Sequence, residues 1–312
     1  MTPPVVVVAG PTASGKSELA LGLAERLGGV VINADSMQLY RELRILTARP
    51  GPDDEARAPH RLYGVVPAAE ACSAARWREM AVAEIEAARA AGRVPLVVGG
   101  TGLYFRALIE GLAPVPDVPD SVRREARALH ARLGGARFHA LLSRRDPAMA
   151  ARLGPGDSQR LVRAYEVLEA TGTSLAEWQS LPPAGPGIER PVVKIVLTPP
   201  RDRLYARCDA RFLAMVAAGA VTEVAALAAL GLDPELPAMK ALGVRELRRH
   251  LDGELDLEAA VLRAQTATRR YAKRQLTWFR HQMAEAAVIA ATDPEARLDE
   301  ALAHLAAREA SP

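Results

Sequence analysis

The sequence is poor in cysteine, in lysine and in long apolar runs, and these scarcities exclude several classes of protein. Only two cysteines, Cys72 and Cys208, occur among the 312 residues, and they form no CxxC pair. A disulfide framework and a cysteine-rich zinc site are therefore excluded. No apolar run approaches the ~18 residues of a membrane-spanning helix, and no basic leader precedes the short N-terminal run. We expect a cytoplasmic protein that makes no membrane contact.

Lysine is the scarcest charged residue. The 40 basic residues comprise 36 arginines and 4 lysines, and 37 acidic residues leave a formal net charge of +3. A GC-rich coding bias explains this high ratio of arginine to lysine. The positions that keep lysine are therefore of interest, because arginine is not an adequate substitute at every site. These positions are Lys16, Lys194, Lys240 and Lys273. The small excess of positive charge is a weak indication of an anionic partner.

Apolar runs and helical spacing alternate along much of the chain. Hydrophobic residues make up 49% of it and charged residues 25%, as in ordinary globular proteins. Short β-branched runs predict strands that are buried on both faces of a parallel sheet. These runs are 5–9, 30–33, 94–98 and 192–197. Helical patterns over 16–27 and 75–91 separate them, which predicts an α/β fold with a doubly wound parallel sheet.

Two proline-rich segments interrupt this alternation. Residues 113–119 and 181–187 predict linkers, and the sequence between them predicts helices only. Residues 120–170 contain ten arginines against six acidic residues, so this insertion is basic. We predict a P-loop-like α/β core formed by residues 1–115 and 190–312, and an all-helical insertion of residues 116–189 that binds RNA.

The rest of the predicted core, from residue 201 onward, is expected to be helical.

A phosphate-binding loop is the strongest motif. The segment GPTASGKS matches GxxxxGK[ST] between a predicted strand and a predicted helix. Backbone amides of such a loop and the N-terminus of the next helix bind phosphate oxygens, while the lysine reaches the outer phosphate and the serine can hold Mg²⁺. The motif indicates a di- or triphosphate, without specifying ATP or hydrolysis. The predicted phosphate-binding residues are Gly10, Pro11, Thr12, Ala13, Ser14, Gly15, Lys16 and Ser17.

Two other polar residues follow predicted strands. Asp35 lies just after the strand 30–33, and Thr101 lies in a glycine-rich turn after the strand 94–98. Ligands bind at the carboxyl ends of strands in open α/β sheets. Asp35 is therefore a candidate metal ligand or general base, with a helix cap or turn as the alternative. Thr101 offers a hydroxyl group to a ligand, unless the segment is a plain tight turn.

A basic helix is predicted between Glu258 and Glu285, because no acidic residue lies between them. Tyr271, Trp278 and Phe279 are interleaved with its basic residues. This combination suits a nucleic-acid backbone and its bases, whereas a solvated face with aromatic residues in the core is the alternative. The basic insertion supplies a second such element and favours RNA. The basic residues of the helix are Arg263, Arg269, Arg270, Lys273, Arg274 and Arg280.

Taken in order, these segments resemble one known family, the bacterial tRNA isopentenyltransferases, also called tRNA dimethylallyltransferases. The resemblance extends from Val5 to about Arg280, and apart from the phosphate loop its motifs are highly specific. Its landmarks are GPTASGKS (10–17), NADSMQLY (33–40), TARP (47–50), PLVVGGTGLYFRAL (95–108), DSQRLVRAYEVLEATG (157–172) and TRRYAKRQLTWFR (268–280).

The resemblance implies a reaction. Dimethylallyl diphosphate gives its five-carbon group to N6 of the adenine that lies 3′ of a tRNA anticodon (position 37), and diphosphate leaves. The family pattern makes Asp35 the general base and places Thr101 at the reaction centre. It also assigns the phosphate loop to the leaving diphosphate, with Mg²⁺ as cofactor, Ser17 as its ligand and Arg211 as an additional diphosphate contact.

The resemblance further implies that the protein binds a tRNA anticodon stem-loop, whose adenine leaves the base stack. We expect a monomer. The sequence departs from the family at Val244, where a tyrosine is usual, and at Arg61, where a second histidine is common. The residues matched to tRNA contacts are Asp35, Ser36, Met37, Gln38, Thr101, Arg123, Gln159, Arg160, Leu161, Val162, Arg163, Lys240, Arg245, Lys273, Arg274 and Arg280.

Three other functions share parts of this pattern. An adenylate isopentenyltransferase has the phosphate loop and the aspartate but does not need an arginine-rich insertion. A P-loop small-molecule kinase and a non-catalytic RNA-binding ATPase also fit the phosphate loop. The acceptor of the prenyl or phosphoryl group distinguishes these functions.

Overall fold

The computed structural model describes residues 3–183, 187–188 and 191–309. The chain divides into two compact units, a large one of residues 1–109 and 188–312 and a small one of residues 110–187. The positions 184–186 of the second predicted linker, and the predicted boundary at 189–190, lie outside the described residues. Each unit has its own hydrophobic core.

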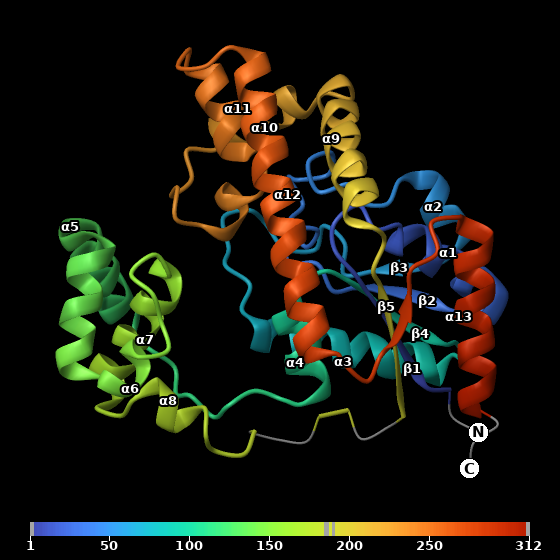
Figure 1. Ribbon diagram of the computed structural model, residues 1–312, viewed down its shortest axis with the longest axis horizontal. Coiled ribbons are helices and arrows are strands. Elements are labelled where there is room, and N and C mark those ends of the chain that lie inside the picture. The colour runs from blue at the N-terminus through green and yellow to red at the C-terminus, as the bar shows by residue number, and fades with distance from the viewer. Residues whose placement is uncertain (1–2, 184–186, 189–190, 310–312) are drawn as a thin grey trace. The chain divides into compact units, whose positions relative to one another are not determined.

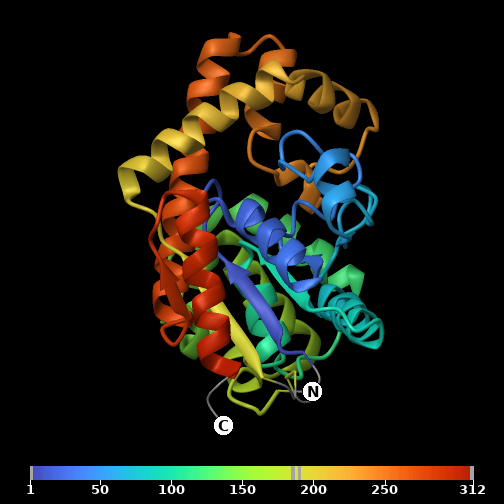
Figure 2. The same ribbon diagram turned by 90° about the vertical axis from the view of Figure 1, so that its right-hand side faces the viewer.

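The large unit is built on a six-stranded parallel sheet with the strand order β3-β2-β4-β1-β5-β6. Figure 2 shows the neighbouring strands β1 and β5 side by side. All residues of β1, β2 and β4 are buried, which is why these strands are continuous apolar runs. The strands are β1 (Val5–Ala9), β2 (Val30–Asn33), β3 (His60–Arg61), β4 (Pro95–Gly99), β5 (Val192–Leu197) and β6 (Ala287–Ile289).

Helices cover both faces of this sheet, so the doubly wound α/β prediction is confirmed (Figure 1). Val6 and Val8 of β1 face a core that includes residues of α1 (Lys16–Leu27) and α13 (Pro294–Glu309). Val5 and Val7 face the opposite core, with residues of α3 (Ala74–Ala90) and α4 (Gly102–Ile109). This alternation follows from the two-residue period of a strand.

The remaining helices of the large unit are α2 (Pro52–Arg57), α9 (Arg201–Ala217), α10 (Ala220–Ala229), the 3₁₀ helix η1 (Pro237–Lys240), α11 (Val244–Leu251) and α12 (Leu257–Gln282). The expectation of helices alone after residue 201 is wrong, because β6 pairs with β5 at the edge of the sheet. The sequence pattern also missed β3, the other edge strand.

In the described part of the chain, no single helix has the length and apolar character needed to cross a membrane. Among the described residues, one pair of consecutive helices, α9 and α10, is long and apolar enough when taken together, but the two helices are bent by 67° relative to each other.

The small unit is helical in all its described secondary structure. Its core includes the fully buried Phe138 and Leu142 from one helix and Leu161 and Val167 from another. The first helix contains a break at Gly134, whose φ of 73° and ψ of 164° are non-helical. The helices are α5 (Asp120–Arg145), α6 (Pro147–Ala150), α7 (Ser158–Thr171) and α8 (Leu175–Trp178).

Candidate active site

The phosphate loop lies between the end of β1 and the start of α1, as predicted. Gly15 caps α1 with a φ of +90°, a left-handed conformation that favours glycine. The Ser14 amide donates to the Pro11 carbonyl at 3.2 Å, which tightens the turn. Lys16 is buried, and its Nζ donates to the same carbonyl at 3.4 Å. The loop therefore holds its lysine folded over the backbone turn.

The charge of Lys16 is poorly solvated in the free protein. Burial lowers its pKa from 10.5 to about 8, although the nearby Asp35 carboxylate raises it and Arg211 lowers it further. A desolvated cation of this kind gains strongly from an anionic ligand. A bound anion would supply that charge and favour the ammonium form.

We expect the Lys16 pKa to be detectable directly, because the chain has only four lysines. In ¹³C–¹H spectra of lysine-labelled protein, the Lys16 ε-methylene signal should titrate near pH 8, and saturating inorganic diphosphate should move the midpoint upward. In the free protein the charge is fully present below this pKa and is lost as the pH rises through it. The variant Lys16→Arg assigns the signal. A midpoint at the ordinary 10.5 in the free protein would contradict the burial argument.

Arg211 of α9 reaches the phosphate loop from the other side. Its Nη2 donates to the Thr12 hydroxyl, and burial lowers the pKa of its guanidinium group. Cys208, one turn earlier, is also buried, with its Sγ 4.0 Å from the Thr12 carbonyl oxygen. The structure thus brings Arg211, Lys16 and the phosphate loop together, as the sequence resemblance implied.

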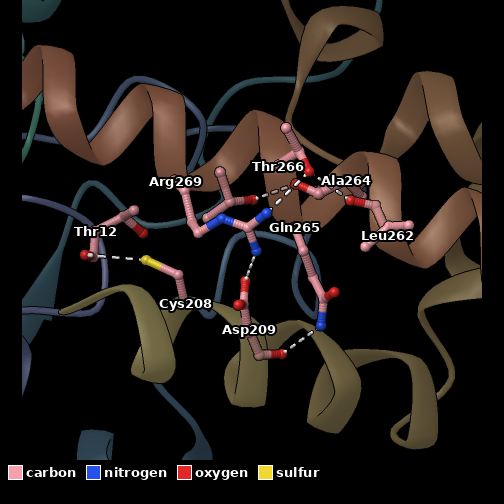
Figure 3. A network of polar contacts seen from close by, with 9 residues as sticks. Thr12, Cys208, Asp209, Leu262, Ala264, Gln265, Thr266 and Arg269 are labelled. Carbon is pink, nitrogen blue, oxygen red and sulfur yellow. Dashed lines mark hydrogen bonds and ion pairs between the residues drawn. The ribbon is translucent and has the colours of Figure 1, made fainter. Parts of the chain in front are cut away.

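A polar network holds α9 against α12 beside this loop (Figure 3). Arg269 of α12 forms an ion pair with Asp209 at 2.5 Å, and the Gln265 amide donates to the Asp209 carbonyl at 3.1 Å. Asp209 lies between Cys208 and Arg211 along α9. Arg269, which the sequence placed in an RNA-binding face, therefore has a structural partner.

Asp35 and Thr101 lie on two loops that are bonded to each other. The Ser36 amide donates to Thr101 Oγ1 at 3.0 Å, and the Thr101 amide donates to the Ala34 carbonyl at 3.2 Å. The Asp35 carboxylate accepts from the Met37 amide at 3.0 Å. The loops that follow β2 and β4 therefore place the predicted carboxylate and hydroxyl at one edge of the sheet.

Tyr271 of α12 completes this side of the site. Burial raises the pKa of its hydroxyl, as does the nearby Asp35 carboxylate. The guanidinium of Arg274 lies 5.6 Å from the centre of its ring. Tyr271 therefore joins the exposed Arg274 to the side of the site that holds Asp35.

Gln275 is the main site residue that sequence reasoning missed. Its Oε1 accepts from the Thr12 amide at 2.9 Å, and its Nε2 donates to the Gly100 carbonyl at 2.8 Å. One buried amide thus joins the phosphate loop to the loop that carries Thr101. A signal was available, because Thr268, Ala272, Gln275 and Phe279 form one buried stripe at helical spacing. A glutamine on such a stripe needs buried partners.

The opposite face of α12 is exposed and basic. A surface pocket of about 390 Å³ is lined there by Arg270, Lys273, Arg274 and Thr277. Arg280 is also exposed, whereas Phe279 is buried with its ring centre 6.2 Å from that of Phe105. The prediction that the aromatic side chains of this helix are available to RNA bases is therefore wrong for Phe279, which packs in the core.

The residues matched to tRNA contacts in the small unit differ in exposure. Gln159 and Arg160 are exposed at the start of α7. Arg163 lies 3.5 Å from Glu166, and Arg123 lies 3.6 Å from Asp120.

The expected contact of Leu161 with tRNA is wrong for its side chain, since Leu161 is fully buried in the core of the small unit.

In the large unit, the segment around η1 and α11 presents two of the predicted cations. Arg245 is exposed, and Lys240 forms an ion pair with Glu235 at 2.8 Å. Val244, where the family usually has tyrosine, is buried. The valine side chain at this position therefore packs in the hydrophobic core.

Comparisons with known proteins show the family of the chain. The sequence profile of the IPP transferase family matches residues 38–282. The chain belongs to this family. It is 64% identical over 285 residues to the tRNA dimethylallyltransferase of Rhodospirillum centenum, covering 91% of each chain. It is 55% identical over 303 residues to that of Phenylobacterium zucineum, covering 97% of this chain and 98% of the relative.

Solved structures of IPP transferases have the same fold. The tRNA isopentenylpyrophosphate transferase from Bacillus halodurans matches with a TM-score of 0.70 and 33% identity, over 98% of each chain. A eukaryotic dimethylallyltransferase acting on tRNA matches with a TM-score of 0.76 and 27% identity, over 94% of this chain and 75% of that one.

Proposed function

We propose that this IPP transferase family member is a tRNA dimethylallyltransferase. It transfers the dimethylallyl group of dimethylallyl diphosphate to N6 of the adenine 3′ of the anticodon and releases diphosphate. The observation that carries the proposal is the convergence of Asp35, Thr101 and the phosphate loop at one edge of the sheet. Relatives that are 55–64% identical over most of the chain and carry this name support it.

The phosphate loop binds the diphosphate as a leaving group in this reaction. Lys16 and Arg211 supply positive charge, and the loop amides at the start of α1 donate hydrogen bonds. Within the described residues, the buried Ser14 hydroxyl has no hydrogen-bond partner, as expected of a donor that serves a bound ligand. These groups stabilise the charge that develops as the bond between C1 and the diphosphate oxygen breaks.

Asp35 accepts the proton that the adenine amine loses. The N6 lone pair is delocalised into the ring, so the amine attacks C1 weakly unless a base removes its proton. The bond from N6 to C1 forms, the bond from C1 to oxygen breaks, and the N6 proton passes to the Asp35 carboxylate. Thr101, whose hydroxyl accepts a hydrogen bond from the Ser36 amide, orients the adenine.

Mg²⁺ fits the donor set of the loop. Mg²⁺ keeps several waters and binds through one or two protein oxygens together with substrate phosphates. The exposed Ser17 at the start of α1 is the ligand we propose. The ion would neutralise charge on the diphosphate.

The anticodon stem-loop is the proposed partner of the basic surfaces. Lys273, Arg274 and Arg280 lie exposed on α12, and Arg160 lies exposed on the small unit, the proposed tRNA-binding insertion. Each basic group that contacts a phosphate releases counterions, so binding of this kind weakens as salt rises. We propose that the protein acts as a monomer in the cytoplasm.

Radiolabelled substrates test the function directly. With dimethylallyl diphosphate labelled in the prenyl group, we expect label in an unmodified tRNA transcript, one diphosphate per transfer, and a requirement for Mg²⁺. AMP and γ-labelled ATP run in parallel. Label in AMP but not in tRNA would establish an adenylate isopentenyltransferase, and phosphate transfer or release from ATP without prenylation would establish a kinase or an ATPase. A tRNA with guanine in place of the target adenine is the matched negative control.

A further inference from the structure

A buried arginine of the C-terminal helix contacts the backbone of the phosphate loop. Arg297 of α13 has a side chain that is 2% exposed, and its Nη1 donates to the Ser14 carbonyl at 3.0 Å. Its Nη2 forms an ion pair with Glu18 at 2.5 Å. A Cβ on Gly15 would lie 1.7 Å from Nη1, so the guanidinium fills the space behind that glycine. No sequence motif pointed to this residue.

We propose that Arg297 is a positioning residue for the diphosphate site. It fixes the conformation of the Ser14–Gly15 peptide and neutralises the carboxylate of Glu18. This inference rests on the proposed function only in naming the ligand as the diphosphate of a prenyl donor. It assigns to α13, which lies beyond the matched segment 38–282, a part in substrate binding.

Glu18 creates the electrostatic problem that Arg297 offsets. It lies in the first turn of α1, the end of the helix to which the phosphate loop directs an anion. A carboxylate there repels a diphosphate carrying several negative charges. Pairing with the guanidinium removes most of that repulsion. The arginine is the buried partner of the pair, while the side chain of Glu18 is 60% exposed.

The contact with Ser14 acts through the peptide group. The Ser14 carbonyl and the Gly15 amide belong to one peptide unit. When the cationic Arg297 donates a hydrogen bond to the carbonyl oxygen, it polarises this peptide unit and makes the Gly15 N–H a stronger donor. That N–H belongs to the loop whose amides bind phosphate. Arg297 therefore holds the peptide in one orientation and strengthens its donor.

Packing keeps α13 in this position. Ala301 and Leu305 are buried in the same core as Leu19 and Leu23 of α1. At the start of α13, the Arg297 amide donates to the Asp293 carbonyl at 3.1 Å, which fixes the backbone that presents the side chain. The side chain reaches the loop from a rigid element and is suited to positioning.

The experiment measures binding of inorganic diphosphate by titration calorimetry, with and without Mg²⁺. We expect Arg297→Met to weaken the affinity by about 10-fold or more, since a charge-assisted hydrogen bond is lost and Glu18 is left uncompensated. Adding Glu18→Gln to this variant should recover part of the loss. The KM for dimethylallyl diphosphate should rise with the dissociation constant, while the KM for tRNA stays unchanged. Arg57→Met, which breaks the exposed ion pair between Arg57 of α2 and Glu25 of α1, is the control and should bind as the wild type does.

Two outcomes would overturn the proposal. One is a folded Arg297→Met protein with wild-type diphosphate affinity, and the other is a double variant that recovers nothing. If the arginine variant does not fold, Glu18→Gln alone keeps the test valid. This exposed substitution should tighten diphosphate binding about 2-fold. An unchanged affinity would count against the proposal. Since the diphosphate titration, unlike the KM measurements, contains neither prenyl donor nor tRNA, its result is independent of the labelling assay that tests the function.

Discussion

Replacing Asp35 with asparagine is expected to lower kcat by about 10²–10⁴-fold, the usual contribution of a positioned general base. Asparagine keeps an Oδ1 that can accept from the Met37 amide, and the Asp35 backbone amide still donates to Asn33 at 2.8 Å. The loop should therefore remain intact, and the variant removes the charge and the proton acceptor alone. Single-turnover prenylation of tRNA at saturating substrates is the measurement.

The pH of this experiment matters, because Asp35 also supports the charge of Lys16. The carboxylate raises the pKa of Lys16, so its removal moves that pKa further below about 8. At pH 7 Lys16 is largely protonated in the native enzyme, and bound diphosphate raises its pKa in the variant as well, so the affinity for inorganic diphosphate should change little there.

Asp54→Asn is the matched control for this variant. Asp54 caps α2 through its Oδ2, which accepts from the Gly51 amide at 3.0 Å, and it takes no part in the site. A wild-type kcat for Asp35→Asn would eliminate Asp35 as the base, and an equal loss in Asp54→Asn would point to a general effect of the substitution.

Local sequence pattern was sufficient for the central part of the fold. The buried strands β1 and β4 are continuous apolar runs, the helix α1 has apolar residues at helical spacing, and the glycine-rich turns after the strands mark their carboxyl ends. The edge strands β3 and β6 contain two and three residues and are only partly buried. No period can be read from so few residues, so these strands depend on the tertiary fold for their existence.

The same distinction separates the site residues that were predicted from those that were not. Asp35 and Thr101 follow strands directly, so the topology of a parallel sheet brings them together. Gln275 and Arg297 contact loops that are 263 and 283 residues away in sequence, and no local pattern names such partners. Leu161 was wrongly predicted to contact tRNA. It belongs to a contiguous family motif that was treated as one surface, although the helix directs part of that motif into the core.

Replacing Gln275 with methionine is expected to lower kcat/KM by about 10–100-fold, because it removes two buried hydrogen bonds in a side chain of similar volume. The Thr12 amide and the Gly100 carbonyl would each lose a partner, and a buried polar group without one costs about 1–3 kcal/mol. The phosphate loop and the Thr101 loop would then shift relative to each other. We expect the KM for dimethylallyl diphosphate to rise and kcat to fall together.

Gln275→Glu separates this positioning role from simple packing. Glutamate can still accept from the Thr12 amide, but it offers no donor to the Gly100 carbonyl and adds a negative charge beside the diphosphate. It should therefore bind inorganic diphosphate more weakly than the methionine variant does, although it retains one of the two bonds. Gln282→Met, on the exposed end of the same helix, is the control and should keep wild-type kinetics. If Gln275 only filled space, methionine would be nearly neutral, and a folded Gln275→Met enzyme with wild-type kcat/KM would show that the two loops hold their geometry without it.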